Sequence, residues 1–107
     1  MQAVLKALAE PRRVEILKLL ARGEMRAGEI AERFDTTRPA ISEHLRVLTE
    51  ARLLVLRRDG TRRIYALREE TFAELREFLD QFWDVRVARL KAAAERAAHA
   101  PARGRRT

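Results

Sequence analysis

The sequence contains no cysteine, only one serine (Ser42) and only two histidines (His44 and His99). The absence of cysteine excludes disulfides, thiolate metal sites and thiol redox sensing. Ser42 and His44 are two residues apart and cannot face each other on a helix, and no glycine-rich phosphate loop is present. Asp80 and Asp84 could hold a hard cation, but a solvated acidic helix face is the simpler interpretation. We therefore expect no catalytic residue, no bound metal and no cofactor.

Long apolar segments are also lacking. No run approaches the roughly 18 residues needed to span a bilayer, and the chain does not open with a signal-peptide pattern. The sequence therefore predicts a cytoplasmic protein without a membrane partner.

Basic charge, by contrast, is abundant and unevenly distributed. The 107 residues carry a net charge of +7, which predicts an acidic partner. Residues 54–68 contain five arginines and one aspartate, whereas residues 69–95 contain four basic and seven acidic side chains. Residues 96–107 add four arginines and no acidic residue. The positive charge is thus concentrated in residues 54–68 and in the C-terminal tail.

The stretch Thr36–Leu54 predicts a helix whose two faces differ in function. Thr37 is a good N-cap, and Pro39 falls in the first turn, where its missing N–H costs nothing. The spacing of the apolar side chains predicts one buried stripe, made of Ile41, Leu45 and Leu48. The opposite face carries Pro39, Ser42, Glu43, Arg46 and Glu50. Such a helix could enter the major groove of DNA, about 12 Å wide; the alternative is an ordinary amphipathic surface helix.

The segments around this stretch favour the DNA-binding interpretation. Helices are predicted over Gln2–Ala9, Pro11–Arg22 and Arg26–Phe34. Strands are predicted over Leu53–Arg58 and Thr61–Leu67, joined at Asp59-Gly60 by a type I′ turn. The tip of this hairpin gathers four arginines, Arg57, Arg58, Arg62 and Arg63. They could simply keep a solvated hairpin from aggregating, but beside a helix-turn-helix they suit a phosphate backbone or minor groove.

A long helix is predicted over Glu70–Arg96, roughly 40 Å at 1.5 Å per residue. Its apolar stripe continues beyond what the small preceding domain can cover, through Phe82, Trp83, Val87 and Leu90. A second copy of the chain is the simplest cover, which predicts a homodimer; packing of the helix back onto its own domain is the alternative. We assign residues 1–96 to one domain and residues 97–107 to a basic tail, predicted to be disordered because it has nothing to bury.

These segments together resemble the ArsR/SmtB family of winged-helix repressors. The motifs that carry the resemblance, within residues 3–95, are LKALAEPRRVEILKLL, GEIAERF, TTRPAISEHLRVLTEARLL and FWDVRVARL. The resemblance implies a mainly α winged helix-turn-helix with five helices and a two-stranded wing, dimerising through its first and last helices. It therefore adds Val4, Leu5 and Leu8 to the expected dimer interface. It also implies binding to operator DNA and release when an effector binds.

The sequence departs from the family pattern at two places. The stretch GEMRAGEIA lacks the thiol motif of many metal-sensing members, and the last helix offers only His99. The chain is thus most similar to the branch without a metal site. Many members also have glycine where this chain has Arg52; if that position is left-handed, Arg52 costs on the order of 1 kcal/mol.

The sequence therefore predicts a sequence-specific double-stranded DNA-binding regulator, a dimeric repressor with an unidentified non-metal effector or partner. Ser42, Glu43 and Arg46 are expected to read bases, next to Pro39, while Thr37 and Arg38 hold phosphate. The wing arginines Arg57, Arg58, Arg62 and Arg63 are expected to supply affinity rather than sequence choice. The alternative is a protein-interaction module on the same scaffold, which would not need the +4 charge of residues 54–68.

Overall fold

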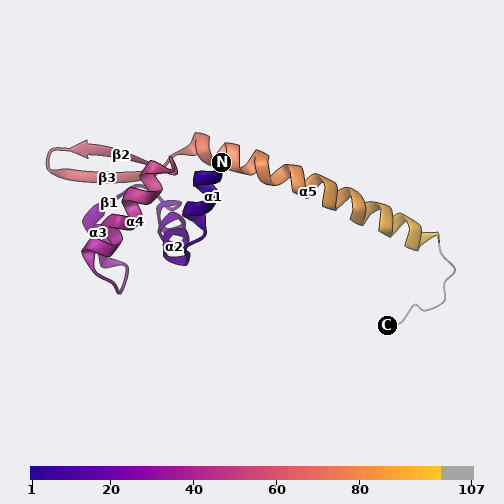
Figure 1. The fold of residues 1–107 in the computed structure, drawn as a ribbon, viewed down its shortest axis with the longest axis horizontal. Coiled ribbons are helices and arrows are strands. Elements are labelled where there is room, and N and C mark those ends of the chain that lie inside the picture. Colours follow the sequence, from indigo (N-terminus) through magenta and orange to yellow (C-terminus); the bar gives the residue numbers. More distant parts are fainter. Residues whose placement is uncertain (100–107) are drawn as a thin grey trace. The chain divides into compact units, whose positions relative to one another are not determined.

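The computed structural model describes the backbone of residues 1–99 and the side chains of these residues except 83–85. Its contacts divide the chain into two units, Met1–Ala73 and Glu74–Thr107. The elements follow in the order α1 (Gln2–Leu8), α2 (Pro11–Leu20), β1 (Met25–Arg26), α3 (Ala27–Glu32), α4 (Arg38–Glu50), β2 (Leu54–Asp59), β3 (Arg62–Leu67) and α5 (Glu69–Ala98) (Figure 1). Within the described residues this confirms the mainly helical fold with five helices. None of the described helices has both the length and the apolar character that crossing a bilayer requires.

The core of the first unit holds α4 by its inner face. Ile41, Leu45 and Leu48, the stripe predicted from their spacing, are at most 2% exposed. They pack with fully buried side chains from α2, α3 and the segment after α4, namely Ile16, Ile30, Leu53 and Leu54. Because the inner face is fixed in this way, the polar face of α4 remains open to solvent.

The sheet has three antiparallel strands in the order β1-β3-β2. The wing formed by β2 and β3 is two-stranded, as predicted, but its turn lies one residue later. Asp59 pairs with Arg62, so the turn residues are Gly60 and Thr61. Gly60 has φ +65°, and Thr61 has no positive φ, which is the φ pattern of a type II′ turn rather than the predicted type I′ turn. The sequence also gave no indication of β1, which pairs with β3 through two residues only.

The predicted helices are all present, with different ends. α2 ends at Leu20 and α3 at Glu32, both two residues before the predicted end. α5 begins at Glu69 and continues to Ala98, so it enters the stretch that was predicted to be a tail. Residues 100–107 of that tail, including Pro101, lie outside the described residues.

α4 ends in a turn that requires a left-handed residue. Arg52 has φ +65°, and the amide of Arg52 donates to the Thr49 carbonyl while the amide of Leu53 donates to the Leu48 carbonyl, both at 3.0 Å. These two bonds form a Schellman motif, in which glycine is the usual left-handed residue. The buried Thr71 hydroxyl donates to the Arg52 carbonyl, and the Arg68 amide donates to the Leu53 carbonyl at 2.9 Å. The turn therefore connects the end of α4 to the start of α5.

The left-handed conformation of Arg52 predicts that Arg52→Gly stabilises the fold. Glycine removes the Cβ clash, so the free energy of unfolding should rise by on the order of 1 kcal/mol. Urea unfolding followed by circular dichroism measures the change. Arg52→Ala retains the Cβ and serves as the control, with little expected effect. Equal stabilisation by glycine and alanine would show that the arginine side chain, not the backbone conformation, carries the cost.

Candidate nucleic-acid interface

The exposed face of α4 begins at its N-cap. The Thr37 hydroxyl oxygen accepts a hydrogen bond from the Ala40 amide at 3.2 Å, and Pro39 occupies the second helical position. The Thr37 hydroxyl hydrogen remains available as a donor. Arg38, at the first helical position, is exposed, as are Ser42, Glu43 and Arg46 further along the same helix.

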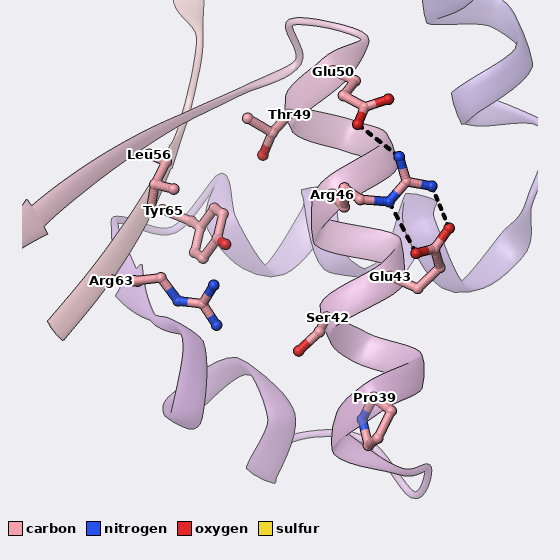
Figure 2. Close-up of a pocket in the computed structure, with 9 residues that line it drawn as sticks. All are labelled: Pro39, Ser42, Glu43, Arg46, Thr49, Glu50, Leu56, Arg63 and Tyr65. Atoms are coloured by element: carbon pink, nitrogen blue, oxygen red, sulfur yellow. Dashed lines mark hydrogen bonds and ion pairs between the residues drawn. The ribbon is translucent and has the colours of Figure 1, made fainter. Parts of the chain in front are cut away.

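A hollow of about 600 Å³ lies between α4 and the wing. Ser42 and Arg63 line its two opposite sides and point toward it (Figure 2). Its lining also includes residues for which the sequence predicted no role, namely Thr49, Glu50, Leu56 and Tyr65. Side chains alternate between the two faces of a strand, and this alternation places Leu56 and Tyr65 on the wing face toward α4. Their position therefore follows once the pairing of β2 with β3 is known.

The four wing arginines divide between the two faces of the hairpin. Arg58 and Arg63 are direct cross-strand partners and share one face. By the same alternation Arg57 and Arg62 belong to the other face. Arg57 is not free, because its Nη2 donates to Glu24 at 2.8 Å. Within the described part of the chain, Arg58, Arg62 and Arg63 form no ion pair, so these three carry the positive field of the wing.

A second hollow, of about 420 Å³, lies where the wing tip meets the start of α3. Arg62, Arg63 and Arg26 line it together with Glu29 and Glu32. Arg26 already pairs with Glu29, Nε to Oε1 at 3.2 Å. The sequence had not indicated Arg26 or Glu32 as neighbours of the wing, since neither belongs to the hairpin.

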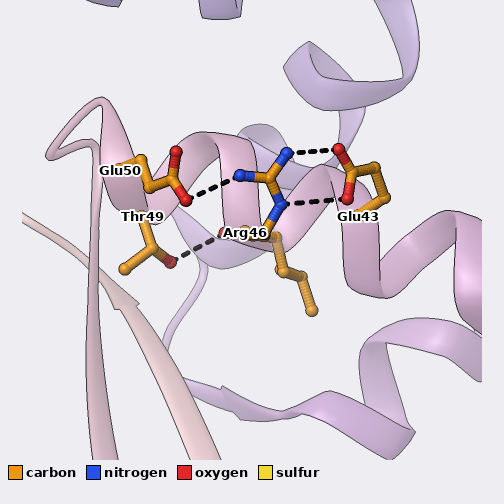
Figure 3. A network of polar contacts seen from close by, with 5 residues as sticks. Glu43, Arg46, Thr49 and Glu50 are labelled. Carbon is orange, nitrogen blue, oxygen red and sulfur yellow. Dashed lines mark hydrogen bonds and ion pairs between the residues drawn. The ribbon is translucent and has the colours of Figure 1, made fainter.

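Arg46, the expected guanine reader, is held between two carboxylates on its own helix (Figure 3). Its Nε donates to Glu43 Oε1 at 3.0 Å and its Nη2 donates to Glu43 Oε2, while its Nη1 donates to Glu50 Oε2 at 2.6 Å. We call these three residues the Arg46 clamp. The clamp is exposed, with more than half of each side chain accessible to solvent. Its helical spacings, i to i+3 and i to i+4, are those at which such pairs form. The spacing therefore allows Glu50 to pair with Arg46, but it does not decide whether Arg46 pairs with Glu43, with Glu50 or with both.

The clamp fixes the charge of this part of α4. The hydrogen bonds from Arg46 lower the pKa of Glu43, and the two carboxylates raise the pKa of Arg46. These two shifts favour the charged forms of Glu43 and Arg46, and the formal charge of the three side chains together is −1. The clamp therefore differs from the wing, whose Arg63 lines the opposite side of the same hollow.

The residues expected at a dimer interface lie in both units and differ in exposure. On α1, Val4 is 6% exposed and belongs to the core of the first unit, Leu8 is half-buried, and Leu5 is 40% exposed. On α5, Phe82, Val87 and Leu90 are each about half exposed or more. Phe82 also packs edge-to-face on Phe78, with ring centroids 5.2 Å apart. The Trp83 side chain lies outside the described residues.

A helix-turn-helix whose second helix presents a polar face, followed by a basic wing, defines a winged helix-turn-helix DNA-binding protein. A family model described as a bacterial regulatory protein of the arsR family matches residues 10–54, from the N-cap of α2 to the first residue of β2. The regulator Rv2034 of Mycobacterium tuberculosis is 46% identical over 78 residues, which are 73% of this chain and 73% of that protein. The chain belongs to the ArsR family, whose members are transcriptional regulators and not enzymes.

Two further relatives describe what members of this family do. An arsenical resistance operon repressor of Staphylococcus xylosus is 34% identical over 80 residues, which are 75% of this chain and 77% of the repressor. The solved Mb0332 domain of Mycobacterium bovis has a TM-score of 0.64 at 36% identity, covering 78% of this chain and 77% of that one. It is described as a homodimeric winged helix-turn-helix DNA-binding domain. The family predicted from the sequence motifs is therefore confirmed, and the chain lacks cysteine throughout.

The clamp predicts an unusually acidic Glu43. Because the Arg46 hydrogen bonds lower the pKa of Glu43, Arg46→Ala should return that pKa toward its ordinary value. Carbon-detected NMR titration of the glutamate side chains measures the shift. Arg38→Ala, which removes an arginine from the same helix without touching the clamp, is the control and should leave Glu43 unchanged. An ordinary Glu43 pKa in the unmodified protein would contradict the clamp.

Proposed function

We propose that this protein is a dimeric repressor that binds double-stranded operator DNA through α4 and the wing and leaves it when an effector binds. The observation that carries the proposal is the exposed polar face of α4, anchored from behind by its buried stripe. The wing that follows has three arginines, Arg58, Arg62 and Arg63, that form no ion pair with any residue whose side chain the structure describes. A helix presented in this way can enter the major groove while the wing reaches the neighbouring backbone. Relatives named as regulators and repressors of bacterial genes support this reading, and we place the activity in the cytoplasm, where bacterial DNA lies.

In this proposal the DNA-contacting residues fall into two groups. Ser42, Glu43 and Arg46 read base edges, with Pro39 beside them. The remaining residues contact phosphate or the minor groove and supply affinity, namely Thr37, Arg38, Arg57, Arg58, Arg62 and Arg63. Arg57 has to leave Glu24, or share its remaining donors, to take part. Arg58, Arg62 and Arg63 need no such rearrangement.

We propose that a second copy of the chain covers the apolar side chains of α5. Phe82, Val87 and Leu90 are large, apolar and exposed on one helix, and exposed apolar side chains gathered in this way often mark an interface. The homodimeric state of the Mycobacterium bovis domain supports this choice of partner. Leu5 is the α1 side chain with most surface left to contribute.

The effector that we propose is not a metal ion. The sequence has no thiol, and two histidines give too few ligands for a closed tetrahedral site. Among the described residues, no group of three or more His, Asp or Glu side chains is arranged to hold a metal. A small molecule or a protein partner is therefore the proposed class of release signal.

A protein-interaction module without DNA binding is the alternative function. The charge of residues 54–68 argues against it, because five arginines against one aspartate serve a phosphate backbone better than an ordinary protein surface.

The division of roles predicts different effects for Arg46→Ala and Arg62→Ala. Arg46→Ala should weaken binding to the operator by about 10- to 100-fold while weakening binding to random DNA much less. Arg62→Ala should weaken both similarly and lower the slope of log K against log salt by about one unit. Fluorescence anisotropy at several salt concentrations measures both, on a site selected from a random DNA pool. If Arg46→Ala leaves the preference unchanged, or Arg62→Ala alone abolishes it, the assignment is wrong.

The proposed dimer predicts a change of mass when the α5 face is charged. The unmodified protein should sediment as a dimer at micromolar concentration, whereas Val87→Glu combined with Leu90→Glu should sediment as a monomer with its helix content retained. Arg89→Ala alters an exposed residue on the same helix and should leave the dimer intact. A monomeric unmodified protein with α5 folded would contradict this part of the proposal.

A further inference from the structure

The Arg46 clamp uses three of the five N–H donors of its guanidinium. Glu43 takes the donor on Nε and one donor on Nη2, and Glu50 takes one donor on Nη1. Arginine has one donor on Nε and two on each terminal nitrogen. One N–H therefore remains on Nη1 and one on Nη2. Two donors on neighbouring nitrogens are what a bidentate contact with guanine O6 and N7 requires.

The two carboxylates hold the guanidinium from both sides along the helix. Glu43 lies three residues before Arg46 and Glu50 four residues after it, so a swing of the side chain toward either end of α4 breaks one of the two contacts (Figure 3). An arginine side chain is long and flexible, and fixing it before binding reduces the entropy lost when it meets a base. The clamp thus presents Arg46 in a restricted set of orientations while leaving it exposed to solvent.

The same carboxylates oppose contact with phosphate. A free arginine on a DNA-facing helix binds any backbone phosphate, which raises affinity for all sequences alike. Within the clamp, Arg46 is accompanied by two negative charges, and a phosphate approaching it is repelled. A guanine edge carries no formal charge and suffers less from this repulsion. The clamp therefore combines an attractive element for one base with a repulsive element for the backbone, which is how specificity is commonly obtained.

We propose that Glu50 is a specificity-determining residue that, together with Glu43, positions Arg46 for a guanine and excludes it from phosphate contacts. This inference rests on the proposed function, since it assumes that α4 enters the major groove. It assigns to Glu50 a positioning role: Glu50 acts through Arg46, and its own carboxylate need not touch DNA.

The test compares the specificity ratio, the dissociation constant for random DNA divided by that for the selected site, in a small set of variants. Glu50→Ala should lower this ratio about tenfold, through weaker binding to the site and tighter binding to random DNA. Glu50→Gln retains an acceptor for Nη1 but lacks the charge, so it should retain affinity for the site while binding random DNA more tightly. Glu32→Ala is the matched charge control, because Glu32 is an exposed carboxylate beside the wing outside the clamp. It should raise both affinities by the same factor and leave the ratio unchanged.

Two further measurements separate positioning from a general effect of charge. In an Arg46→Ala background, Glu50→Ala should no longer change the ratio. Replacing the contacted guanine with 7-deazaguanine removes the N7 acceptor; it should weaken binding about tenfold in the unmodified protein, less in Glu50→Ala, and not at all in Arg46→Ala. Circular dichroism confirms that each variant is folded.

The outcomes distinguish this inference from the proposed function. If the unmodified protein prefers no DNA sequence, the proposed function fails and the role of Glu50 with it. If the unmodified protein and Arg46→Ala behave as proposed but Glu50→Ala retains the full ratio, only the inference fails. A decrease in the ratio that persists without Arg46 would also overturn it, because Glu50 would then act on DNA independently.

Discussion

The Schellman turn at the end of α4 is the constraint on which the surface formed by α4 and the wing depends. Leu53 must reach the core directly after the helix, and it does so only because Arg52 turns the chain through a left-handed conformation. The direction of β2, and with it the position of the wing beside α4, follows from that turn. The hydrogen bonds from Thr71 and Arg68 then attach the start of α5 to the same few residues. A change in either helix therefore acts on a common turn.

Burial explains which parts of this fold the sequence could predict. The α4 stripe is predictable because the spacing of its three apolar side chains places them on one face only if the segment is a helix. All three are buried. The wing is predictable because two segments with the residue pattern of β-strands flank an Asp-Gly pair. The predicted turn nevertheless lies one residue too early in the chain. Glycine can occupy either central position of a two-residue hairpin turn, and only the pairing of Asp59 with Arg62 decides between the two. β1 could not be predicted, because two residues carry no periodicity and pair only through contacts with a distant strand.

The candidate site shows a different limit. Exposure of Ser42, Glu43 and Arg46 follows from helical geometry, so the residues on the solvent-exposed face of α4 could be named from the sequence. How those residues engage one another could not, because a single arginine flanked by carboxylates at i−3 and i+4 can pair with either, with both or with solvent. In the same way, the four wing arginines form one cluster in sequence but divide between two faces, and one of them pairs with Glu24, 33 residues earlier in the chain.

In the proposed complex with DNA, the charges of α4 and the wing suit two different parts of the duplex. On the wing, Arg58 and Arg63 are opposed directly across the strands, and like charges in that position repel each other. A DNA phosphate placed between or beside them relieves this repulsion, so the unbound wing already favours binding of a phosphate. On α4 the positive charge of Arg46 is already paired with two carboxylates, which leave the clamp at −1, so the clamp gains nothing from an additional anion. A backbone contact at the wing and a base contact at α4 therefore favour one orientation of the protein on the duplex. The exchanged orientation would place the net negative clamp against phosphate and leave the wing arginines without a phosphate partner.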